Sequence, residues 1–200
     1  MKTQTFQNEA EWLDARRGKI TGSRLKDIIT KRGTGKKMGF YELIAERLAV
    51  KPDDERPIDR GHRLESEAIE RFVKETGKKV DTSLIMWVRE DDESIAISPD
   101  GIIGKTEAVE VKCLSSALHI KAIITKAIPD EYEEQAIQYF IVNDKLKKLY
   151  FVFYDPRFVK HDYYCLEFTR KDFQEKIDTY LAYQRDTLAE VNQIVSDLSF

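Results

Sequence analysis

The chain has 200 residues, 42% of them hydrophobic and 10% aromatic, which suffices for one buried core and excludes a disordered chain. A formal net charge of -3 excludes a histone-like or polybasic protein, so a polyanion would have to be bound by a local basic patch. Two cysteines, Cys113 and Cys165, are too few for a zinc ribbon or a cysteine-ligated iron–sulfur cluster.

The first predicted elements lie in a basic region. From Arg16 to Lys37 the chain has nine basic residues and one acidic residue. Thr21 or Ser23 suits the N-cap of a short helix over residues 24–30, because a hydroxyl there can accept a hydrogen bond from a free backbone N–H. Arg16 and Ser23 then bracket a helix N-terminus, where backbone N–H groups and the helix dipole favour an anion such as phosphate.

Two amphipathic helices are expected next. Apolar residues recur at helical spacing over residues 40–50, and a polar loop through Pro57 ends that helix. The second helix has one apolar face, made of Leu64, Ala68, Ile69, Phe72 and Val73. Its first turn is expected over residues 61–65, and Gly77 ends it. Glu65 alone predicts only a surface residue that the helix dipole favours.

A run of strands follows. Residues 84–89 and 94–98 predict a hairpin around an acidic turn, and the second strand leads into Asp100. If the next strand contains Glu110 and Lys112, these two side chains lie on one face, because successive side chains of a strand alternate between faces. The stretch would then place two carboxylates and an ammonium on one side of a sheet.

This grouping has a chemical use. Carboxylate oxygens are hard ligands that suit Mg²⁺ or Mn²⁺, and Mg²⁺ usually takes one or two carboxylates together with phosphate oxygens of a substrate. A lysine beside the metal can position an attacking water and offset the charge that builds on a phosphate. The alternative is a turn over residues 98–101 followed by an edge strand with a solvated Glu110–Lys112 pair. This stretch alone leaves both interpretations open.

The last third of the chain adds a helix, two strands and a long helix. Pro129 begins a helix that runs to about Val142. One face of this helix is rich in amide and aromatic side chains, namely Tyr132, Gln135, Gln138 and Tyr139. Residues 149–154 predict a strand buried on both faces, residues 161–168 a further strand, and residues 171–198 an amphipathic helix.

The order of these elements predicts an α/β (α+β) fold with a central mixed β-sheet flanked by helices. No repeat or low-complexity segment divides the chain, so residues 1–200 are expected to form a single domain. The sequence shows no signal peptide and no long apolar run, and its cysteine usage suits a reducing compartment. We therefore expect a cytoplasmic protein with no membrane partner.

Four stretches together resemble a known family. They are Trp12-x3-Arg16-x-Gly18-x-Ile20-Thr21-Gly22-Ser23, Arg60-Gly61-x3-Glu65, Ser98-Pro99-Asp100-Gly101 with Glu110-Val111-Lys112, and Tyr132-x2-Gln135. In this order they are similar to the phage lambda exonuclease family, also called the YqaJ-type viral recombinase or alkaline exonuclease family, of the PD-(D/E)XK nuclease superfamily. The chain departs from the family pattern at Gly22, where alanine is expected, and in its spacing after Gln135.

The resemblance implies a restriction-endonuclease-like core and a set of site residues. Asp100 and Glu110 would be metal ligands, together with the backbone carbonyl of Val111, and Lys112 would position and activate the water. The outer residues Glu65 and Gln135 would orient metal, water or lysine, and Arg16 and Ser23 would bind a terminal 5′-phosphate.

The same resemblance implies a Mg²⁺-dependent exonuclease, with Mn²⁺ as a substitute. It would degrade one strand of linear double-stranded DNA 5′ to 3′, giving mononucleotides and 3′ overhangs for recombination. Family members are ring-shaped homo-oligomers, usually trimers, threaded by DNA, so the basic region could line a channel in an acidic protein. A single-strand annealing recombinase would be a partner, in the bacterial cytoplasm of a phage or prophage host. The alternatives are another PD-(D/E)XK endonuclease and a non-catalytic DNA-end-binding module.

Overall fold

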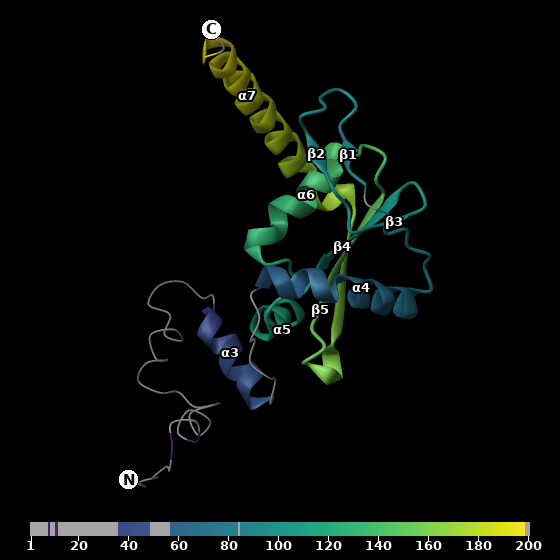
Figure 1. The fold of residues 1–200 in the computed structure, drawn as a ribbon, viewed down its shortest axis with the longest axis vertical. Helices are drawn as coiled ribbons and strands as arrows, with labels where there is room; N and C mark the ends of the chain where they lie inside the picture. Colours follow the sequence, from purple (N-terminus) through teal and green to yellow (C-terminus); the bar gives the residue numbers. More distant parts are fainter. Residues whose placement is uncertain (1–7, 9–10, 12–35, 49–56, 84, 199–200) are drawn as a thin grey trace.

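The computed structural model describes residues 8, 11, 36–48, 57–83 and 85–198 (Figure 1). Its centre is a four-stranded mixed sheet in the order β3-β4-β5-β6. The strands are β3 (Gly101–Ile103), β4 (Glu107–Lys112), β5 (Lys148–Tyr154) and β6 (Tyr163–Phe168). The inner strands β4 and β5 are parallel, and both outer pairs are antiparallel. The expected mixed sheet is therefore confirmed, and β4 is an interior strand.

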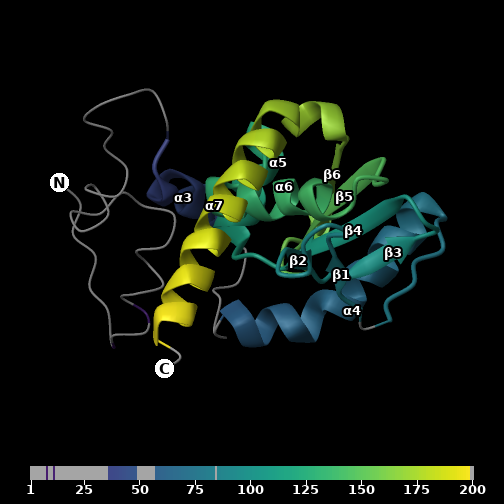
Figure 2. The same cartoon turned by 90° about the horizontal axis from the view of Figure 1, so that it is seen from above.

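Helices cover both faces of this sheet (Figure 2). One face packs on α4 (Pro57–Thr76), and the other packs on α5 (Ser116–Thr125), α6 (Glu133–Val142) and α7 (Gln174–Leu198). Each interior strand therefore divides its side chains between two cores, as the period of two in a strand requires. Residues 149–154 are buried throughout, which confirms the strand predicted to be buried on both faces.

Further short elements complete the fold. The helix α3 (Met38–Arg47) packs against α5, and it confirms the helix expected over residues 40–50. Three 3-10 helices precede α6, β6 and α7, and they span Asp130–Tyr132, Val159–His161 and Arg170–Phe173. The long helix α7 extends away from the sheet (Figure 1).

The predicted hairpin forms, with shorter strands than expected. It consists of β1 (Trp87–Val88) and β2 (Ala96–Ile97), paired antiparallel with Trp87 opposite Ile97. An acidic turn over residues 90–93 joins them, as expected. The strand β2 ends three residues before Asp100, so the hairpin delivers the chain to that carboxylate.

Two expectations for α4 are wrong. The helix begins at Pro57 and not near residue 61, because proline suits the first position of a helix, where its missing N–H costs nothing. Glu65 therefore lies in the third turn, away from the helix N-terminus. Val73 is 36% exposed and does not belong to the packed face. Gly77 has a positive φ of 66°, which confirms it as the residue that ends the helix.

The helix α5 was not expected from the sequence. Ser115 caps it, since its side chain accepts a hydrogen bond from the backbone N–H of Leu118 at 3.4 Å. Residues on several sides of α5 are buried: Ser116, Ala117, His119, Ile120 and Ala122. A helix covered by α3 and the sheet has no polar face, so it lacks the period that reveals an amphipathic helix.

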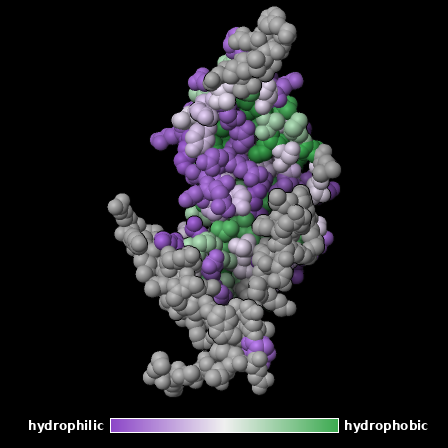
Figure 3. Space-filling model, turned by 60° about the vertical axis from the view of Figure 1, so that its left-hand side comes forward, coloured by the Kyte–Doolittle hydropathy of each residue, from purple (hydrophilic) through white to green (hydrophobic). Residues whose placement is uncertain are grey.

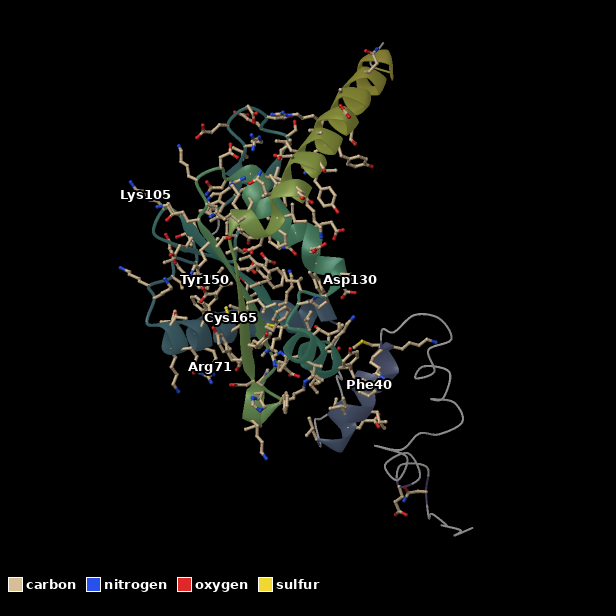
Figure 4. The ribbon with its side chains drawn as sticks, turned by 180° about the vertical axis from the view of Figure 1, so that it is seen from behind. Phe40, Arg71, Lys105, Asp130, Tyr150 and Cys165 are labelled. Atoms are coloured by element: carbon tan, nitrogen blue, oxygen red, sulfur yellow. The ribbon has the colours of Figure 1, made fainter. Side chains whose placement is uncertain are left out.

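The two faces of the sheet are tied to their helices differently. On the α4 side, Tyr150 and Cys165 lie on the strands, and Arg71 on α4 pairs with Asp162 beyond β5 at 3.2 Å (Figure 4). On the other side, the larger core joins β4 and β5 to α5, α6 and α7.

The described surface seen in Figure 3 is largely hydrophilic, with smaller hydrophobic areas. None of the helices within the described ranges is both long and apolar enough to cross a membrane.

Candidate active site

The strand β4 separates its polar and apolar side chains as its sequence predicts. Val109 and Val111 are buried in the core beside α4. Glu110 points to the opposite face, toward α6, and only 1% of it is exposed. Its neighbours β3 and β5 pair with both edges of β4. This excludes the alternative of an edge strand with a solvated Glu–Lys pair.

Three side chains donate hydrogen bonds to the Glu110 carboxylate. Lys112 Nζ lies 2.5 Å and Gln135 Nε2 lies 2.6 Å from Oε1. The hydroxyl of Tyr139 lies 2.5 Å from Oε2. A buried carboxylate is costly unless its oxygens are hydrogen-bonded, so this set of donors makes the burial of Glu110 tolerable.

Asp100 is held beside Glu110 by the backbone of β4. Its Oδ2 accepts a hydrogen bond from the N–H of Val111 at 2.7 Å. The next residue must be small, because a Cβ added to Gly101 would lie 2.5 Å from Cγ1 of Val80. Glycine at this position therefore lets β3 start directly after Asp100 and brings its carboxylate to the centre of β4.

The electrostatics of this pair favour a bound cation. Burial, and then the nearby charge of Asp100, raises the pKa of Glu110 to about 7, although Lys112 acts in the opposite direction. Burial also raises the pKa of Asp100 above its ordinary value. Two adjacent carboxylates that resist ionisation would be stabilised by a hard divalent cation, so the residues fit the expected Mg²⁺ or Mn²⁺.

The donor set also limits how such a cation would be held. Among the residues that the structure describes, no three His, Cys, Asp or Glu side chains form a group suited to a metal. A cation at Asp100 and Glu110 would therefore need oxygens from the backbone, water or a substrate. Mg²⁺ commonly binds in this way, with one or two carboxylates and several waters.

Lys112 is fixed from two directions. Its ammonium lies 2.5 Å from Glu110 and 5.2 Å from the centre of the Tyr132 ring, which supplies a cation–π contact. Its side chain is 18% exposed, so the ammonium remains reachable by solvent or substrate. This position suits a group that would hold a water beside the two carboxylates.

The helix α6 supplies the other side of the site. Gln135 and Tyr139 are four residues apart, so both side chains point from one face of the helix toward Glu110. The structure thus brings together Asp100, Glu110, Lys112 and Gln135, although the spacing after Gln135 departs from the family pattern. Their catalytic roles stay predictions.

The remaining predicted site residues are Glu65, Arg16 and Ser23. Glu65 is half-buried on α4, whose apolar side packs against the opposite face of β4, and it lines a surface pocket with Glu70 and Thr82. Arg16 and Ser23, with the helix expected over residues 24–30, lie outside the described residues. Their proposed roles stay predictions.

Tyr139 is the site residue without a predicted role. The sequence placed it on the polar, aromatic face of a helix, and its spacing of four from Gln135 was the available signal. Burial, together with the charge of Glu110, raises its pKa far above the ordinary value, so its hydroxyl remains a donor.

Cys113 follows the site strand in sequence and packs against the α4 side of the core, in line with a packing role.

Comparisons with known proteins agree with this geometry. Residues 11–145 match the family model of the YqaJ-like viral recombinase domain. A crystal structure of an alkaline exonuclease (LHK-Exo) from Laribacter hongkongensis is similar, with 29% identity, a TM-score of 0.62, and coverage of 95% of this chain and 98% of that one. The structure of LHK-Exo in complex with dAMP has the same identity and coverage, with a TM-score of 0.61. No curated protein matches the chain.

Proposed function

Because the chain belongs to the YqaJ-like viral recombinase family, as the sequence motifs indicated, we propose that it is a metal-dependent DNA exonuclease. Its similar solved structures are alkaline exonucleases, and one of them binds dAMP, a mononucleotide. The observation that carries the proposal is the pair of adjacent carboxylates, half-buried Asp100 and buried Glu110, with the ammonium of Lys112 beside them. Such a group suits hydrolysis of a phosphodiester.

Each residue of the site would have its own role in hydrolysis. Asp100, Glu110 and the backbone carbonyl of Val111 would hold Mg²⁺, or Mn²⁺ in its place. The bound ion would polarise the scissile phosphate and lower the pKa of a water. Lys112 would orient that water and offset the negative charge of the transition state. Gln135 would keep the Glu110 carboxylate in place through its hydrogen bond at 2.6 Å.

The direction of degradation forms the finer part of the proposal. Arg16 and Ser23 would bind a terminal 5′-phosphate, so that one strand of a linear duplex is degraded 5′ to 3′ to mononucleotides. The 3′ overhang left behind would serve recombination with a single-strand annealing protein in a bacterial host. The basic region from Arg16 to Lys37 would face the DNA, within a trimeric ring. Contacts of this kind are mainly to phosphate and weaken steeply with salt.

The first experiment measures release of acid-soluble nucleotides from a linear 5′-phosphorylated duplex with Mg²⁺, and again with EDTA. We expect release only with Mg²⁺. Labelling one strand at its 5′ or its 3′ end reports the direction, and loss of the 5′ label first is the expected result. Cutting of a closed circular plasmid would contradict the proposal and favour a PD-(D/E)XK endonuclease.

The Glu110→Gln variant separates catalysis from binding. We expect it to bind DNA ends while releasing almost no nucleotides, because the amide carries no charge for the cation. If the wild type binds ends but releases nothing with Mg²⁺ or Mn²⁺, the chain is a DNA-end-binding module and the proposed function is wrong. Arg16→Ala should remove most of the preference for 5′-phosphorylated over 5′-hydroxyl ends.

A further inference from the structure

The hydroxyl of Tyr139 contacts the buried Glu110 carboxylate of the site. It donates to Oε2 of Glu110 at 2.5 Å, whereas the other two donors, Lys112 and Gln135, both reach Oε1. The Tyr139 hydroxyl is therefore the side-chain donor on Oε2 of Glu110, the oxygen that Lys112 and Gln135 do not contact.

The ring that carries this hydroxyl is itself fixed. Tyr139 is fully buried near the middle of α6. Its ring meets the Trp87 ring edge to face, with the centroids 6.2 Å apart and the planes at 85°. Trp87 belongs to β1 of the hairpin that leads into Asp100. The hydroxyl is thus held by both segments that build the site, α6 and the hairpin.

The hydrogen bond to Oε2 has a consequence for the carboxylate. With donors on both oxygens, the plane of the Glu110 carboxylate is set from two sides, and the group cannot rotate without breaking a charge-assisted hydrogen bond. Residues that orient metal-binding carboxylates in this way typically affect metal affinity or activity about 10- to 100-fold. Core packing alone would explain the ring of Tyr139 but not the aim of its hydroxyl.

We propose that Tyr139 is a positioning residue of the site, which sets the orientation of the Glu110 carboxylate for cation binding. The inference rests on the proposed function, because it concerns the cation that this function requires. In this role Tyr139 acts only through the Glu110 carboxylate.

The test is Tyr139→Phe, which keeps the ring and removes the hydroxyl. The matched control is Tyr154→Phe, since the Tyr154 hydroxyl contacts the Glu67 carboxylate at 3.3 Å on the other side of the sheet. We expect the dissociation constant for Mn²⁺, measured by calorimetry without DNA, to rise about 10- to 100-fold in Tyr139→Phe and to stay unchanged in the control. Nuclease activity of Tyr139→Phe should fall at low Mg²⁺ and recover as Mg²⁺ is raised.

The outcomes separate this inference from the function beneath it. If the wild type binds Mn²⁺ and degrades DNA while Tyr139→Phe has the same Mn²⁺ affinity and Mg²⁺ dependence, the inference is overturned and the function stands. If the wild type neither binds Mn²⁺ nor degrades DNA, both fall. Should Tyr139→Phe fail to fold, Trp87→Phe keeps the hydroxyl but loosens its ring, and it should weaken Mn²⁺ binding by a smaller factor; unchanged binding would again overturn the inference.

Discussion

The middle of β4 is buried on both faces, but the two faces have opposite energetic roles. Val109 and Val111 pack against the apolar face of α4, where removal of their side chains from water stabilises the fold. Glu110, between them in sequence, loses its hydration on burial. Its three hydrogen bonds replace only part of the stabilisation that water would give its charged form. The pKa of Glu110 is therefore raised to about 7. Val109 and Val111 therefore stabilise the protein, whereas the burial of Glu110 is accounted for by the proposed chemistry.

The largest effect is expected on the polar face, from Lys112→Ala. The change removes the ammonium 2.5 Å from Glu110, and with it the group proposed to orient the water. We expect kcat for nucleotide release to fall about 10³-fold, equivalent to about 4 kcal/mol. Single-turnover kinetics at saturating Mg²⁺ measures it, and circular dichroism checks the fold. An unchanged kcat would mean that this face is not the hydrolytic site.

The apolar face should show the reverse pattern in Phe72→Ala. Phe72 is fully buried, and its ring centre lies 5.1 Å from that of Tyr150. Truncation leaves a cavity, which is expected to lower the free energy of unfolding by about 3–5 kcal/mol. Urea unfolding measures the loss. The activity of the molecules that remain folded should match the wild type, and a large fall in their kcat would show that the two faces are coupled.

A smaller, pH-dependent effect is expected from Glu110→Gln in metal-free protein. The pKa of Glu110 is raised from 4.5 to about 7 by burial first and then by the charge of Asp100. A raised pKa contributes stability that is complete below the ordinary value of 4.5 and lost as pH rises through about 7. The wild type should therefore lose stability between pH 5 and pH 8, while Glu110→Gln should not.

The difference between these two proteins should grow by on the order of 1–3 kcal/mol over that interval. Urea unfolding in EDTA at both pH values measures it, with Glu107→Gln as the control because Glu107 is a half-buried residue of the same strand that pairs with Lys78. Added Mg²⁺ should restore the stability of the wild type at pH 8. A wild type equally stable at both pH values would contradict the proposed cost of the ionised Glu110.

The contrast between the faces also explains how much of the site the sequence could predict. Alternation along β4 follows from the covalent geometry of a strand, so the shared face of Glu110 and Lys112 was predictable. Gln135 was predictable from the motif, and Tyr139 only from its spacing on the helix. Whether β4 lies inside the sheet depends on its pairing with β5, whose residues are 41 positions further along the chain than their partners, and local sequence carries no such signal.

The errors have a related origin. The helix α5 is buried on several sides, so its sequence lacks the polar stripe that marks a surface helix. The start of α4 was misplaced because Pro57 suits both the end of a loop and the first turn of a helix. The burial of α5 and the start of α4 both depend on tertiary packing, because packing determines which surfaces other elements cover.

The smallest effect is expected from a lysine–glutamate pair that burial does not strengthen. Lys145 and Glu90 lie 3.4 Å apart, and their side chains are 79% and 91% exposed. Water and salt screen such a pair, so Lys145→Ala should leave the urea midpoint and the kcat unchanged within error. Lys112 differs because its partner Glu110 is only 1% exposed, so water cannot replace the ammonium when Lys112 is removed. If Lys145→Ala lowered kcat as much as Lys112→Ala, burial of the partner carboxylate would not account for the importance of Lys112.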